Sequence, residues 1–92
     1  MFQVKEVRLF FNPYDDDEKW DCGKPSSFYE SDSYLESILK AGQIIGGKYA
    51  AIIYLNGKEI QAVWENEATG EISAAPDLES LIDLLNQKER KK

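Results

Sequence analysis

The chain has 92 residues, 42% of them hydrophobic. These values are typical of one small globular domain that buries a hydrophobic core without disulfides or metal ions to stabilise it. The chain carries 17 acidic and 11 basic residues, for a net charge of −6, and no histidine, which excludes Ser-His-Asp or Cys-His catalysis and histidine-ligated metals. The single Cys22 excludes an intramolecular disulfide and a multi-cysteine zinc site.

The first element, residues 2–11, is predicted to be a strand, because it is rich in Phe and Val and largely alternates apolar with polar residues. The alternation changes phase near Lys5 and Glu6. This change predicts either a β-bulge at that point or a strand that is covered on both faces.

Residues 12–32 are predicted to form a long irregular connection, because Pro13, Gly23 and Pro25 interrupt it. Residues 12–36 hold eight acidic and two basic residues, so their net charge of −6 equals that of the whole chain. Residues 10–34 also hold seven of the eleven aromatic residues. The connection is therefore both acidic and aromatic-rich.

The first helix should begin at the capping box SYLE, residues 33–36, with Ser33 as the N-cap and Glu36 reaching back to it. This helix places Leu35, Ile38 and Leu39 on one side and should end at Gly42.

Residues 48–65 predict a β-hairpin, because Asn56-Gly57 is the preferred pair for a two-residue type I′ turn. Pairing of Leu55 with Lys58 sets the register. One face, which should be the core side, then holds Tyr49, Ala51, Ile53, Ile60, Ala62 and Trp64. The other face includes Ile52, Tyr54 and Val63 and should be only partly covered.

A short strand is expected at residues 72–75, and Pro76-Asp77 should start the last helix. Its apolar stripe has helical spacing and consists of Leu78, Leu81, Ile82 and Leu85. The predicted order is β-α-β-β-β-α, an α+β fold in which an antiparallel meander carries two helices on one face. We expect one domain over residues 1–92, with a basic tail at 88–92 that complements the helix dipole.

The four consecutive acids at residues 15–18 allow several interpretations. A calcium-loop arrangement would use Asp15 and Asp17 as ligands, but Lys19 takes the third ligand position. Catalytic carboxylates need a cleft, and these acids lie together on one predicted loop. We therefore expect no metal, no cofactor and no enzymatic activity. The acidic residues near Cys22 should raise the pKa of its thiol, so we expect Cys22 to be unreactive.

A solvated loop would explain the acids but not the aromatic residues. These rings can pin the connection onto the core, or they can be contact residues for a partner, and the two roles do not exclude each other. Those that look like pins are Phe10, Phe11 and Phe28. Those that look like contacts are Tyr14, Trp20 and Tyr29.

The leading hypothesis is a small acidic, non-enzymatic binding protein that docks on a basic, nucleic-acid-binding surface of a protein partner. It would act as an inhibitor, of the kind that phages, mobile elements and toxin immunity systems use. Direct binding of nucleic acid is not expected, because that needs clustered Lys and Arg. The candidate partner-binding residues are Tyr14, Asp15, Asp16, Asp17, Glu18, Trp20, Asp21 and Tyr29.

The alternative is a structural or assembly module, a homodimer that self-associates through a face of the 48–65 hairpin or through an edge strand. Under either hypothesis we expect a cytoplasmic protein without membrane contact. The N-terminus MFQVKEVRLFF lacks the pattern of a signal peptide, and no stretch reaches the roughly 18 apolar residues of a membrane span.

Overall fold

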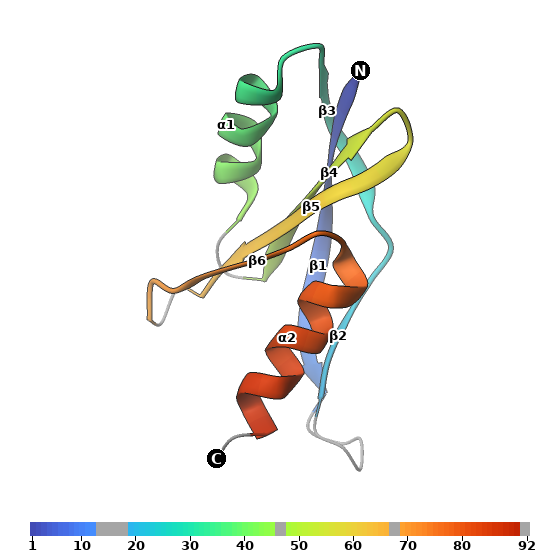
Figure 1. Cartoon of the computed structure of the whole chain (residues 1–92). Coiled ribbons are helices and arrows are strands. Elements are labelled where there is room, and N and C mark those ends of the chain that lie inside the picture. The colour runs from blue at the N-terminus through green and yellow to red at the C-terminus, as the bar shows by residue number, and fades with distance from the viewer. Residues whose placement is uncertain (13–18, 46–47, 67–68, 91–92) are drawn as a thin grey trace.

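The computed structural model describes residues 1–12, 19–45, 48–66 and 69–90, which form an α+β domain (Figure 1). Its strands are antiparallel and form one curled, half-barrel sheet, against which two helices pack. In chain order the elements are β1 (Phe2–Asn12), β2 (Lys19–Cys22), β3 (Ser26–Ser31), α1 (Tyr34–Ile44), β4 (Tyr49–Leu55), β5 (Lys58–Glu65), β6 (Ile72–Ala75) and α2 (Leu78–Arg90). The predicted fold class is confirmed. None of the described helices is long and apolar enough to cross a lipid bilayer.

The sheet has the strand order β2-β1-β4-β5-β6, and β3 also pairs with β1. The expectation of an irregular connection over residues 12–32 is wrong, because β2 and β3 both lie in it. They follow each other along β1: β2 pairs with the end of that strand, from Leu9 onward, and β3 pairs with its start, up to Glu6. Of the two explanations for the phase change in β1, coverage of both faces is confirmed, because Val4 lies in one hydrophobic cluster and Val7 and Leu9 lie in the other. The register shift opposite Val4 and Lys5 places the extra residue, Phe28, in β3 and not in β1.

The β4–β5 hairpin has the predicted turn, with φ values of 51° at Asn56 and 84° at Gly57, as a type I′ turn requires. The predicted pairs nearest the turn are confirmed, up to Tyr54 opposite Glu59. Beyond them the register shifts, so that Ile53 faces Gln61 and not Ile60. The predicted single core face is wrong for this reason: one extra residue in β5 moves every later pair by one position.

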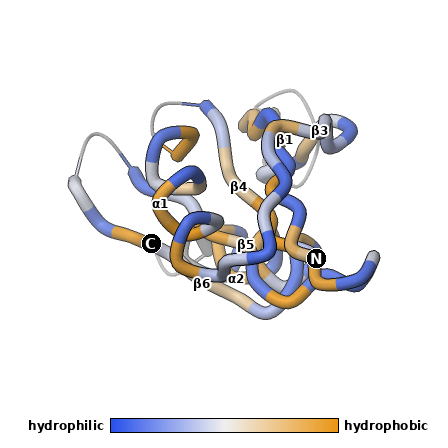
Figure 2. Tube along the Cα trace, turned by 90° about the horizontal axis from the view of Figure 1, so that it is seen from above, coloured by the Kyte–Doolittle hydropathy of each residue, from blue (hydrophilic) through white to orange (hydrophobic). Residues whose placement is uncertain are grey.

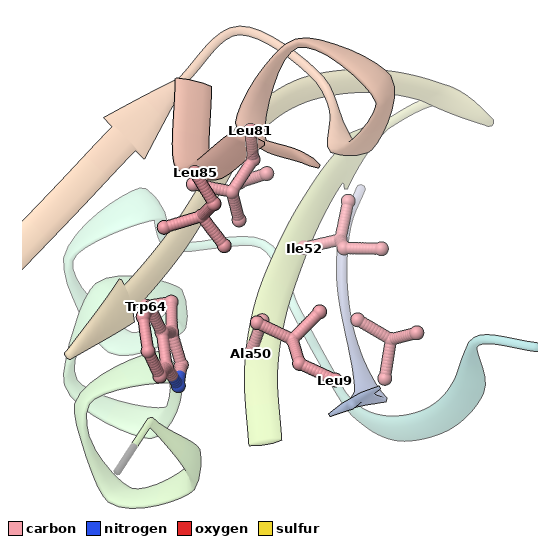
Figure 3. Packing of buried hydrophobic residues seen from close by; sticks show 8 residues of the cluster. Leu9, Ala50, Ile52, Trp64, Leu81 and Leu85 are labelled. Atoms are coloured by element: carbon pink, nitrogen blue, oxygen red, sulfur yellow. The ribbon is translucent and has the colours of Figure 1, made fainter. Parts of the chain in front are cut away.

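Two hydrophobic clusters result. The larger one lies under α2 and contains Val7, Leu9, Ala50, Ile52, Ala62, Trp64, Leu81 and Leu85 (Figure 3). The smaller one lies under α1 and contains Val4, Ala41, Ala51 and Ile53. Because successive residues of a strand point to opposite faces, α1 and α2 cover opposite sides of β4. The single helix-covered face expected from the sequence is thus divided into two.

Helix α2 closes the opening of the curled sheet, because it contacts β2 at one end of the strand order and β5 and β6 at the other. Its predicted apolar stripe is confirmed: Leu81 and Leu85 are buried, and Leu78 and Ile82 pack against them. Asp77 caps the helix by accepting a hydrogen bond from the Ser80 N–H at 2.7 Å. The helix runs to Arg90, so it includes most of the predicted basic tail, and residues 91–92 lie outside the described range.

Helix α1 has the predicted N-cap, where Ser33 Oγ accepts from the Glu36 N–H at 3.3 Å. It runs past Gly42 to Ile44. The side that carries Leu35 and Leu39 faces outward, with exposed fractions of 68% and 61%. Small residues on the opposite side let the helix approach the sheet closely, and both hydrophobic and hydrophilic residues are visible along it in Figure 2.

Candidate partner-binding groove

The predicted partner-binding residues fall into two groups. The first group lies outside the described residues and consists of Tyr14, Asp15, Asp16, Asp17 and Glu18. The other three are described: Trp20 and Asp21 lie on β2, and Tyr29 lies on β3. The structure therefore locates only part of the predicted site.

The ring of Trp20 packs into the larger hydrophobic cluster. Its centroid lies 5.6 Å from that of Phe11 and 5.3 Å from that of Trp64. Trp64 belongs to β5, which is three strands away from β2, so the curl of the sheet brings the two rings together. The half-buried Trp20 is thus a core residue at the edge of the cluster.

The distinction drawn from the sequence between pins and contacts is reversed for the rings that the structure describes. Tyr29 is half-buried against the smaller cluster, and the Lys40 ammonium lies 5.0 Å from its ring centroid. By contrast, Phe10, Phe11 and Phe28 are 42%, 38% and 45% exposed. The local sequence does not predict this reversal. Whether each ring is buried depends on which elements cover its face of the sheet.

Asp21 is exposed and lies at the rim of a groove of about 420 Å³ between β2, the β4–β5 hairpin and the start of α2. We call this the acidic groove. Its floor is mainly apolar and consists of Cys22, Pro25, Tyr54, Leu78 and Ile82. Its charged residues are all acidic: Asp21, Glu59, Glu79 and Asp83.

The helical repeat explains how α2 contributes to both parts of the groove. Leu78 and Ile82 are four residues apart and face the sheet, while Glu79 and Asp83 follow each of them and are exposed at the rim. Glu59 has a structural role as well, because its Oε1 accepts a hydrogen bond from the Leu78 N–H at 3.2 Å at the start of the helix.

The groove disfavours further negative charge. Burial raises the pKa of the Cys22 thiol, and the Asp21 carboxylate raises it further. Burial and then Glu59 likewise raise the pKa of Tyr54, although the Lys5 ammonium lies 4.5 Å from its ring centroid. A protonated thiol is a poor nucleophile. Burial, the larger cause of both shifts, disfavours a charge of either sign, whereas the carboxylates of Asp21 and Glu59 favour a cation.

The acidic side chains are spread around the rim. Within the described residues, no three Asp, Glu or Cys side chains are grouped so that they could hold one metal ion. Separated carboxylates over an apolar floor are suited to an extended cationic group, such as the side chain of Lys or Arg, whose methylenes bury while its charge stays at the rim.

Sequence reasoning identified Asp21 but missed Glu59, Glu79 and Asp83. The signal for the helical pair was present, because Glu79 and Asp83 are spaced by four residues beside the apolar stripe. Nothing local indicates that this face of α2 lies beside β2.

Comparison with known proteins gives no relative. No family model matches the sequence, and no curated protein or solved structure matches it significantly.

Proposed function

We propose that this protein is a small, acidic, non-enzymatic binding protein, and that its acidic groove receives basic side chains of a protein partner. The observation that carries the proposal is the composition of the groove, in which four carboxylates surround an apolar floor and none of the described residues that line it is basic. Charge-assisted hydrogen bonds from Lys or Arg would satisfy these carboxylates. The apolar floor would bury the methylene groups that carry the charge.

The partner we propose is a nucleic-acid-handling protein, because such proteins expose large basic surfaces. The excess negative charge of residues 12–36 would steer the encounter and accelerate association. By occupying the basic surface, the protein would act as an inhibitor of the phage, mobile-element or immunity type, in the cytoplasm. Direct binding to nucleic acid is disfavoured by the net charge of −6.

The test is the affinity of the protein for a short lysine-rich peptide, measured by fluorescence anisotropy. We expect binding that weakens at least about tenfold between about 50 and 500 mM salt. The double variant Glu79→Gln/Asp83→Asn removes two charges from the groove and should lose most of the affinity.

The matched control is Glu30→Gln/Asp32→Asn, which removes two exposed charges that do not line the groove. It should retain most of the affinity. Equal losses in both double variants would show that net charge alone drives binding, and would overturn the role of the groove.

One observation favours self-association as the alternative function. Strand β6 lies at one end of the strand order, and its Ile72 is 60% exposed. The hairpin face that contains Ile52 is not available, since that side chain is fully buried. Light scattering discriminates between the two functions: a dimer that persists at high salt and dissociates on Ile72→Ser favours an assembly module.

A further inference from the structure

A second pocket, with the opposite charge, lies where β1 approaches its end. It has a volume of about 300 Å³ and is lined by Arg8, Leu9, Phe10, Phe11, Trp20 and Lys48. We call it the basic pocket. Sheet pairing assembles it: Phe11 faces Trp20 of β2, and the Leu9 N–H donates to the carbonyl of Lys48 at 2.6 Å.

The charged side chains of the basic pocket are both cations. Among the residues that the structure describes, no acidic residue lines it. Arg8 and Lys48 are exposed, and neither makes an ion pair with another residue in the described part of the chain. Two cations that line one pocket provide charge and hydrogen-bond donors for an anion.

Aromatic rings supply the rest of the lining. Phe10 and Phe11 are 42% and 38% exposed, although phenylalanine gains free energy when its ring is buried. The Trp20 ring, in contrast, is held between Phe11 and Trp64. The pocket thus offers both exposed and fixed aromatic surface beside its cations. Flat rings stack on such surfaces, and an arginine or lysine beside them adds attraction to an anionic substituent.

We propose that the basic pocket binds a small anion that carries a flat ring, such as a nucleoside monophosphate. Arg8 and Lys48 hold the anionic group, and the ring stacks on Phe11 beside the Trp20 indole, because Phe10 points to the other face of β1. The volume of about 300 Å³ lies at the lower end for small-molecule sites, so the ligand is a single small unit. A long polyanion is disfavoured, because the chain has a net charge of −6 and this pocket provides two cations. This site is independent of the acidic groove.

The experiment is a nuclear magnetic resonance titration of the full chain with adenosine 5′-monophosphate, with adenosine and with inorganic phosphate. We expect the monophosphate to shift the amide signals of Arg8, Phe10 and Lys48 and the indole signal of Trp20, and to bind at least about tenfold more tightly than either fragment. Equal binding of phosphate alone would overturn the role of the rings, and equal binding of adenosine would overturn the role of the cations.

Two variants that each remove one positive charge test where the ligand binds. Arg8→Gln should weaken binding of the monophosphate by about tenfold or more, because it removes a charge-assisted contact. Lys24→Gln removes one exposed charge outside the pocket and should leave binding unchanged. The same loss in both variants, or shifts that do not map to the pocket, would overturn the proposal. A single-stranded oligonucleotide that binds more tightly than the monophosphate would also overturn it, since the site would then belong to a nucleic-acid surface.

Discussion

The side-chain amide of Asn86 makes hydrogen bonds to both backbone polar groups of Trp20. The Trp20 N–H donates to Asn86 Oδ1 at 2.7 Å, and Asn86 Nδ2 donates to the Trp20 carbonyl at 3.4 Å. Asn86 belongs to α2, and Trp20 belongs to the edge strand β2. The amide therefore occupies the place that a neighbouring strand would take, and it satisfies an edge that would otherwise be open to pairing with another chain. The same contact fixes α2 beside β2, which forms the acidic groove.

Replacing Asn86 by Ala should lower the free energy of unfolding by about 1–3 kcal/mol, because two hydrogen bonds are lost at a partly buried edge. Urea denaturation monitored by tryptophan fluorescence measures this change. Gln87→Ala is the control, since the neighbouring side chain is exposed. Equal stability of the two variants would show that the amide contact contributes nothing.

A matched pair of leucine substitutions tests which side of each helix is buried. Leu81 on α2 is fully buried, so Leu81→Ala should cost about 2–5 kcal/mol. Leu39 on α1 is 61% exposed, so Leu39→Ala should change stability by less than about 0.5 kcal/mol. Denaturant titration of both variants is the measurement. A large cost at Leu39 would mean that its side of α1 is covered in solution.

The cap of α2 predicts a pH dependence of stability. Hydrogen bonds from the backbone and the side chain of Ser80 hold the pKa of Asp77 below its ordinary value of 3.8. A carboxyl whose pKa is lowered by folding stabilises the protein above its unfolded pKa, and this contribution is lost as the pH falls through the folded pKa. Asp77→Ala should thus be less stable than the native chain at neutral pH, and the difference should shrink as the pH falls below 3.8.

Asp77→Ser is the control for charge, because serine can cap the helix without titrating. Thermal unfolding at several pH values compares the three proteins. A stability difference between native chain and Asp77→Ala that stays constant across the acidic range would contradict this assignment.

The thiol of Cys22 should react slowly with an uncharged maleimide at neutral pH, because burial and Asp21 both raise its pKa. Asp21→Asn removes the second cause, so the pH profile of alkylation should move to lower pH while remaining above that of a free cysteine. Asp32→Asn lies outside the groove and should leave the profile unchanged. Coincident profiles for Asp21→Asn and the native chain would rule out an electrostatic effect of Asp21.

The parts of the fold that the sequence predicts are those with strong local signals. The 3.6-residue spacing of the leucines and Ile82 predicts α2, and Asn56-Gly57 predicts the hairpin turn. The bulge in β5 was not predicted, because its extra residue, Ile60, is apolar. With or without the bulge, both faces of the hairpin carry apolar residues, so the sequence does not distinguish the two registers. Strands β2 and β3 were not predicted because Pro13, Gly23 and Pro25 interrupt the segment, and because Lys, Asp and Glu are depleted in strands. Pairing with β1, which is not local in the sequence, makes them strands.

The residues of the acidic groove could also be predicted only in part from the sequence. Asp21 was predicted because it belongs to an acidic run, but Glu59 and Glu79 come from the hairpin and from α2. Only tertiary packing brings those elements beside β2. The exposure of Phe10 and Phe11 is equally non-local, since it depends on where the two helices cover the sheet.

The central claim is that basic side chains of a partner enter the acidic groove, and Cys22 on the groove floor reports this directly. The measurement is the alkylation rate of Cys22 by an uncharged maleimide, with and without a saturating lysine-rich peptide. Occupation of the groove should slow the reaction several-fold at low salt, and high salt should restore the rate as the peptide dissociates. A peptide that binds while the rate stays unchanged would place the contact elsewhere and contradict the account.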